Sequence, residues 1–252
     1  MQHVSDTSLI FSAVRSGDAE AIGLLIQRYG NLLHSVATRI LGSPDDAQRV
    51  ARQCAMEIAR APYKLRGEPV VAIHERITRS ASQHRSGNGP SPARDPAEEP
   101  HWEEIRPFLD PALLRVARRH RLIIILHYFQ RHGQEELAEM LQVTQPVVAQ
   151  RLRRALDSLR RRLVSLGAGC SMGQLMLLLA RHGASEAPTG WVEAVADDAQ
   201  REFVAQPTAR RRGWVGLVTG WIIIAGLVAA VGFSYSSMWE SAEATATQPV
   251  AK

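Results

Sequence analysis

Residues 134–155 read QEELAEMLQVTQPVVAQRLRRA. Leu137 and Leu141 are four positions apart, which places both on one face of a short helix. The next two residues interrupt this spacing, and Thr144 is of a type that favours the N-cap of a following helix. The stretch therefore predicts two helices joined by a tight turn, the arrangement of a helix-turn-helix.

The second of these predicted helices has an apolar face and a polar face. Val148, Leu152 and Ala155 recur at helical spacing and are expected to be buried. The polar face offers glutamine and arginine, which hydrogen-bond to adenine and guanine edges and hold phosphates. The residues that we predict to bind DNA are Thr144, Gln145, Gln150, Arg151, Arg153 and Arg154. The alternative is a plain helical bundle with a basic face.

Charge is distributed unevenly along the 252 residues, whose formal net charge is +5. Residues 113–163 contain eleven arginines against four acids, whereas residues 95–104 contain five acids and no lysine or arginine. A basic block next to an acidic spacer favours a polyanionic partner for the block. A solvated helix face is the simpler alternative.

No motif of catalytic or metal-binding chemistry is found. Residues 74–78, HERIT, lack the second histidine of a zincin motif, and the sequence has no nucleophile elbow or phosphate-binding loop. Cys54 and Cys170 are far apart and in no metal-ligand spacing. We therefore expect a protein that is not an enzyme, without a cofactor, a metal site or a disulfide framework.

Helical spacing extends through most of the chain, and no segment alternates as a strand does, so the predicted class is all-α. Residues 86–100, SGNGPSPARDPAEEP, contain four prolines and two glycines and predict a flexible linker. The predicted division is a helical domain at 1–85, a linker at 86–110, a helix-turn-helix domain at 111–168, a juxtamembrane regulatory segment at 169–212, a transmembrane helix at 213–235 and a tail at 236–252.

Residues 214–233, WVGLVTGWIIIAGLVAAVGF, contain no charged side chain. As a helix, this run would span roughly 30 Å, the thickness of the hydrocarbon core of a bilayer. The arginines at 210–212 precede it, and the positive-inside rule then predicts cytoplasmic N-terminal domains and a tail outside. Gly216 and Gly220 permit close pairing of two such helices, which makes a homodimer a candidate assembly. The alternative is a buried core helix.

A longer pattern surrounds the helix-turn-helix. It consists of an apolar helix, a glycine, E-[IL]-A-x-x-L-x-V-[ST] and then R-L-x-R-A, and it is matched by Gly133, Glu136, Leu137, Ala138, Leu141, Val143, Thr144, Arg151, Leu152, Arg154 and Ala155. With these residues, the chain resembles region 4 of sigma-70-type RNA polymerase sigma factors, and most closely the extracytoplasmic-function group. The resemblance implies binding to the promoter −35 element. Ala149 departs from it, because the family usually has lysine or arginine there.

Residues 15–48 resemble region 2 of the same group. The matching positions are Gly17, Asp18, Ala21, Tyr29, Gly42, Asp46 and Ala47. The resemblance implies contact with the −10 element and with the clamp helices of core RNA polymerase, the latter through Asp46, Gln48, Arg49 and Gln53. The family's next helix is rich in acids, whereas this chain has Arg49 and Arg52 there.

Together these features predict a sigma factor tethered to the bacterial cytoplasmic membrane by a single pass. Its expected partners are core RNA polymerase, promoter DNA and the lipid bilayer, with an anti-sigma protein or a protease as further candidates. Residues 169–212 and the anchor either inhibit the protein in cis or only localise it. The alternatives are a helix-turn-helix regulator without sigma activity and a degenerate sigma-like protein that sequesters a partner.

Overall fold

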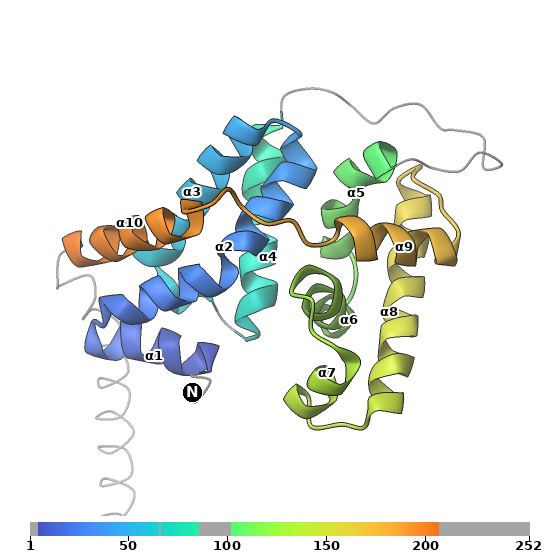
Figure 1. The fold of residues 1–252 in the computed structure, drawn as a ribbon, viewed down its shortest axis with the longest axis horizontal. Coiled ribbons are helices and arrows are strands. Elements are labelled where there is room, and N and C mark those ends of the chain that lie inside the picture. Colours follow the sequence, from blue (N-terminus) through green and yellow to red (C-terminus); the bar gives the residue numbers. More distant parts are fainter. Residues whose placement is uncertain (1–4, 66, 86–101, 207–252) are drawn as a thin grey trace, which may run out of the picture. The chain divides into compact units, whose positions relative to one another are not determined.

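The computed structural model describes residues 5–65, 67–85 and 102–206, and every regular element within them is a helix (Figure 1). The predicted all-α class is therefore confirmed for these residues. The N-terminal elements are α1 (Asp6–Ser16), α2 (Ala19–Leu41), α3 (Pro44–Arg60), η1 (Pro62–Lys64) and α4 (Pro69–His84). They are followed by α5 (Trp102–Leu114), α6 (Arg118–Ile124), the π-helix η2 (Ile125–Phe129), α7 (Gln134–Met140), α8 (Gln145–Ser165), α9 (Met172–His182) and α10 (Trp191–Ala205).

All of these helices belong to one compact unit, residues 1–205, and residues 206–252 form a second unit. Helix α2 is central to the first unit, because it packs against α1, α3, α4, α5 and α10. Most of its large apolar side chains are buried, and those of Ile22, Leu25, Ile26 and Leu33 have no exposed surface. A helix that is apolar on most of its sides is stable only when neighbours cover those sides, as they do here.

Local sequence explains where α2 begins and ends. The Asp18 carboxylate accepts hydrogen bonds from the backbone N–H groups of Glu20 and Ala21, at 3.0 and 3.2 Å, and so caps the helix. Gly42 ends the helix with φ at 76°, in the left-handed region that favours glycine. Ser43 then caps α3 through its side chain. The tight α2–α3 connection follows from Gly42 and Ser43.

The predicted linker ran to residue 110, whereas α5 already begins at Trp102. Two glutamates in its first turn interact favourably with the helix dipole. Ile105 and Leu109 are one turn apart and fully buried. Burial of this apolar face therefore outweighs the cost of the two prolines inside the helix.

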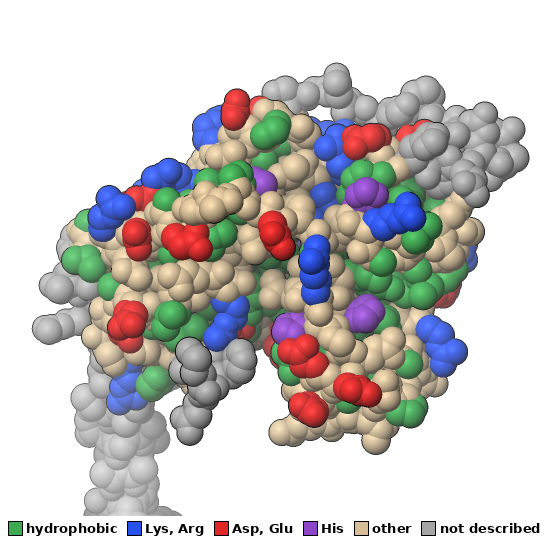
Figure 2. All heavy atoms as spheres, in the orientation of Figure 1, with side chains coloured by type: hydrophobic (Ala, Val, Ile, Leu, Met, Phe, Trp, Pro, Cys, Tyr) green, Lys and Arg blue, Asp and Glu red, His purple; other side chains and the backbone are tan. Residues whose placement is uncertain are grey.

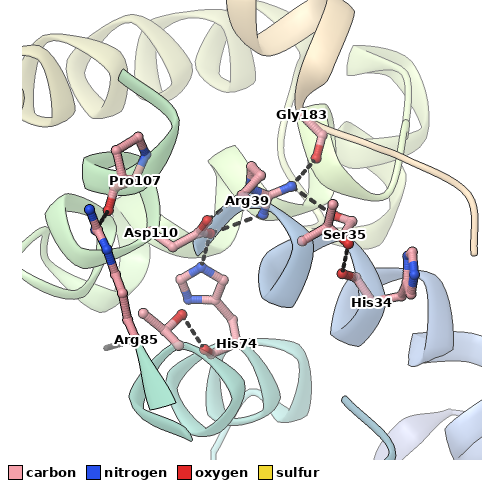
Figure 3. Close-up of polar contacts among 10 residues, drawn as sticks. His34, Ser35, Arg39, His74, Arg85, Pro107, Asp110 and Gly183 are labelled. Carbon is pink, nitrogen blue, oxygen red and sulfur yellow. Dashed lines mark hydrogen bonds and ion pairs between the residues drawn. The ribbon is translucent and has the colours of Figure 1, made fainter. Parts of the chain in front are cut away.

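A buried polar cluster connects α2, α4 and α5 (Figure 3). Arg39 on α2 donates to both carboxylate oxygens of Asp110 on α5, at 2.8 and 2.9 Å, and His74 on α4 lies 2.9 Å from the same carboxylate. Arg39 also donates at 2.7 Å to the Gly183 carbonyl, which follows α9. Burial alone would raise the pKa of Asp110, but the Arg39 charge and the hydrogen bonds from His74 and Arg39 lower it to about 2. Asp110 is thus a buried, charged group with its partners in place.

The predicted transmembrane helix at 213–235 and the predicted tail at 236–252 lie outside the described residues. In the part of the chain that the structure describes, no helix has the length and apolar character needed to cross a membrane.

Arg39→Met is expected to lower the free energy of unfolding by about 3–5 kcal/mol, because it leaves the Asp110 charge buried and unpaired. Adding Asp110→Leu removes that charge and is expected to restore part of the loss. Urea unfolding followed by circular dichroism measures both changes.

The control for Arg39→Met is Arg161→Met, which removes an exposed ion pair with Asp157 and should change stability by less than about 1 kcal/mol. Equal stability of Arg39→Met and Arg161→Met would contradict a structural role for the buried pair.

Candidate nucleic-acid interface

Helices α7 and α8 form the predicted helix-turn-helix. The turn between them places Gln142 at φ 52°, and the Val143 N–H donates to the Ala138 carbonyl at 2.9 Å. Thr144 occupies the N-cap position of α8 with an extended backbone, as predicted, although its side chain makes no capping hydrogen bond. The two helices therefore meet through a tight turn whose geometry is held by backbone bonds.

The inner face of α8 packs against α5, α6 and α7. Val148, Leu152 and Ala155 are at most 5% exposed, so their predicted burial is confirmed. Leu137 on α7 is fully buried as well. This packing fixes α8 with its opposite face in solvent.

Six residues were predicted to bind DNA, and each of them has an exposed side chain: Thr144, Gln145, Gln150, Arg151, Arg153 and Arg154. Among the described residues, no ion pair involves Arg151, Arg153 or Arg154. Other arginines of the basic block are engaged internally, because Arg121 is buried and pairs with Glu75 at 2.5 Å. Arg151, Arg153 and Arg154 are thus available to an external anion.

Arg151 and Arg154 line a hollow of about 510 Å³ between α6 and α8, together with Arg119 and His120 of α6. Burial lowers the pKa of His120, and the charges of Arg119 and Arg154 lower it further. The guanidinium groups of Arg119, Arg151 and Arg154 therefore converge at a hollow that a phosphate could enter. The sequence reasoning had not selected Arg119 and His120, although both belong to the RRHR run at 118–121 that precedes the apolar helix.

The residues predicted to bind polymerase lie on α3 and are separate from this surface. Arg49 is exposed and pairs with Asp46, which lowers the pKa of that carboxyl through a hydrogen bond and through charge. Gln53 is exposed and donates to Glu57 at 3.4 Å, and Gln48 is half-buried. The structure therefore gathers these four residues on one helix and does not bring them to the DNA-binding set.

No metal-binding or disulfide chemistry adds to this surface in the described part of the chain. No group of His, Cys, Asp and Glu that could hold a metal ion occurs among the described residues. Cys54 and Cys170 are free thiols, and burial raises the pKa of Cys54 to about 12, which keeps it protonated.

Arg151→Ala and Arg154→Ala are each expected to weaken binding to duplex DNA, because both side chains project from α8 into the hollow. Loss of a phosphate contact reduces the slope of log affinity against log salt by about 1, while loss of a bidentate base contact costs about 1–3 kcal/mol. Arg119→Ala is expected to behave as a phosphate contact. Fluorescence anisotropy across a salt series measures both effects.

The matched control is Arg201→Ala, which removes an exposed arginine of α10. It should leave affinity and salt slope unchanged. If Arg151→Ala and Arg154→Ala also leave both quantities unchanged, α8 is not the DNA-binding helix.

Residues 112–161, from within α5 to within α8, match the family described as Sigma-70, region 4. A comparison with curated proteins finds no match. The matched segment contains the helix-turn-helix, the hollow and the six exposed side chains described above. Residues 112–161 are therefore similar to region 4 of sigma-70 proteins, and this similarity supports a sigma-like or helix-turn-helix transcription factor.

Proposed function

We propose that the chain is a membrane-tethered sigma factor that binds core RNA polymerase and directs promoter-specific transcription initiation. Helix α8 reads the −35 element, and the N-terminal helices engage the polymerase and the −10 element. The observation that carries the proposal is that Arg151, Arg153 and Arg154 project from α8 without an ion-pair partner among the described residues, within the segment that matches region 4. The protein acts by binding and not by catalysis.

A second basic hollow supports contact between the N-terminal helices and nucleic acid. It has a volume of about 390 Å³ and is lined by Lys64, Arg76, Arg79 and Arg118, with Glu75 among them. Arg76 and Arg79 lie on α4, one turn apart. A polyanionic strand is the ligand that such a set of cations attracts.

The membrane tether rests on the sequence of residues 214–233, which is uncharged and long enough to cross a bilayer. The arginines at 210–212 orient it with the helical unit in the cytoplasm. In this arrangement, the bacterial cytoplasmic membrane holds a promoter-reading protein near its surface, and a protease or an anti-sigma protein would control its release.

A second candidate function is a helix-turn-helix regulator that does not act as a sigma factor. One observation favours it: Arg49 and Arg52 lie on α3, where the sigma-70 resemblance implies acids for the polymerase clamp, and Arg52 pairs with Asp198 of α10. A chain with this surface could bind DNA and fail to recruit the polymerase.

Transcription in vitro separates the two candidates. Purified full-length chain, core RNA polymerase and genomic DNA of the same organism are incubated, and RNA 5′ ends are sequenced. A sigma factor is expected to produce new start sites with a shared upstream motif, and these should vanish when Arg151→Ala and Arg154→Ala are combined. A salt-dependent DNA complex without new start sites would instead establish the regulator.

The tether is tested with a reporter that is active only in the cytoplasm. We expect activity when it is fused after Ala209 and silence when it is fused after Lys252, because the arginines at 210–212 retain the N-terminal side. Activity at both positions would rule out the predicted membrane-spanning helix, and the reverse pattern would show that its orientation is opposite to the predicted one.

A further inference from the structure

Helix α10 packs against α2 across two glycines that are seven residues apart (Figure 1). A β-carbon at Gly30 would lie 2.6 Å from Cγ1 of Val192, and one at Gly23 would overlap the Gln200 side chain. Val192 and Gln200 are eight residues apart on α10, so the two helices run antiparallel with their contacts in register. The glycines thus form a groove on α2 that admits a second helix at close range.

The other side of this groove is α3, which contributes charge. Arg52 pairs with Asp198, and Nε of Arg60 lies 2.7 Å from Oε1 of Glu202. The two acids are four residues apart on α10 and therefore share one face. Figure 2 shows acidic and basic side chains next to one another over α10 and α3. The shape of α2 and the charges of α3 thus together fix the position of α10 along the groove.

Several features make α10 separable from this groove. Its buried side chains are Val195, Ala196, Ala199 and Phe203, of which the first three are small. Both ion pairs remain substantially exposed on the arginine side. A hollow of about 670 Å³ opens to the surface beside the start of α2 and the end of α10.

His34 adds a further unfavourable contribution to the docked state. It is buried on α2, and its ring lies 5.4 Å from the ring of Trp191. In the described part of the chain, neither ring nitrogen has a hydrogen-bond partner. Burying a polar group without a partner costs free energy, and withdrawal of Trp191 would return the ring to water.

We propose that α10 is a displaceable internal ligand of a helix-binding groove on α2 and α3, and that a partner's acidic amphipathic helix binds there when α10 leaves. The chemistry of α10 defines that partner: two carboxylates one turn apart, beside small apolar residues that fit over the glycines. Recognition of this kind is a helix laid into a preformed groove. In the closed state, α10 excludes the partner.

The groove lies beside the residues implied in polymerase binding, so the inference deepens the proposed function. Arg49, Gln53 and Arg60 recur at helical spacing on one face of α3. Arg60 is held by α10, and the other two remain exposed. A polymerase helix that approaches this face would therefore meet α10.

The test uses the full-length chain and a fluorescent peptide of residues 188–206. Val192→Arg places a long charged side chain over Gly30, which releases α10 and leaves the groove itself unchanged. Because the tethered helix is present at a millimolar effective concentration, its release should tighten peptide binding by more than about tenfold. Ala194→Arg, on the exposed face of α10, is the matched control and should bind as weakly as the unaltered chain.

A second pair of variants locates the peptide even if Val192→Arg fails to fold. Gly30→Ala forces out the native α10, and a peptide with Val192→Ala then fits the altered groove. This chain should prefer the altered peptide to the native peptide by more than about tenfold. Gly173→Ala, at a helical glycine with open space around it, should show no such preference. Two outcomes would overturn the proposal. In the first, the Gly30→Ala chain binds both peptides equally. In the second, the native peptide binds the unaltered chain and the Val192→Arg chain equally.

Charge is tested with a peptide in which Asp198 and Glu202 are replaced by lysine. It should lose its binding to the Val192→Arg chain, and retained binding would refute the acidic-helix specificity. Core polymerase is then added as a competitor. If the polymerase displaces the peptide, the polymerase is the partner of the groove. If the peptide stays bound, the groove still binds an acidic helix, but the polymerase does not bind through it, and this contact is removed from the proposed function.

Discussion

The ion pair between Arg39 and Asp110 is the contact on which the rest of the structure depends. The side chains are 4% and 0% exposed, so neither charge has access to water that could replace its partner. Charges in such an environment are tolerated only when paired and hydrogen-bonded. The pair joins α2 to α5 across the segment 86–101, and His74 adds α4 to the same carboxylate. These contacts therefore hold α2, α4 and α5 together at one buried carboxylate.

The same arginine also connects the C-terminal helices to this centre. Its guanidinium donates to the Gly183 carbonyl and lies 4.2 Å above the ring of Phe129. Position 183 favours glycine, because a β-carbon there would lie 2.9 Å from the Tyr128 carbonyl oxygen. Withdrawal of α10 would leave both oxygens of Asp110 bound to Arg39. The N-terminal helices thus keep their central ion pair in either state of α10, which is what a displaceable helix requires.

Sequence reasoning identified what local patterns determine. The helix-turn-helix and the buried face of α8 follow from spacings of three and four residues, and both are present. The start of α5 was placed too late, since its stability comes from burial of Ile105 and Leu109 against other helices. The docking of α10 was not predicted either. It depends on glycines of α2 meeting side chains far along the chain, and such pairings have no local periodicity. Membrane insertion concerns residues outside those described and stays a prediction.

Helix α3 has as many acids as arginines, and two of its arginines are paired with acids of α10. Arg52 pairs with Asp198 and Arg60 pairs with Glu202. The carboxylates of α10 therefore balance the two arginines of α3 that face it. Any partner that binds this face must either carry acids, as α10 does, or approach by the exposed Arg49 and Gln53 while α10 stays bound.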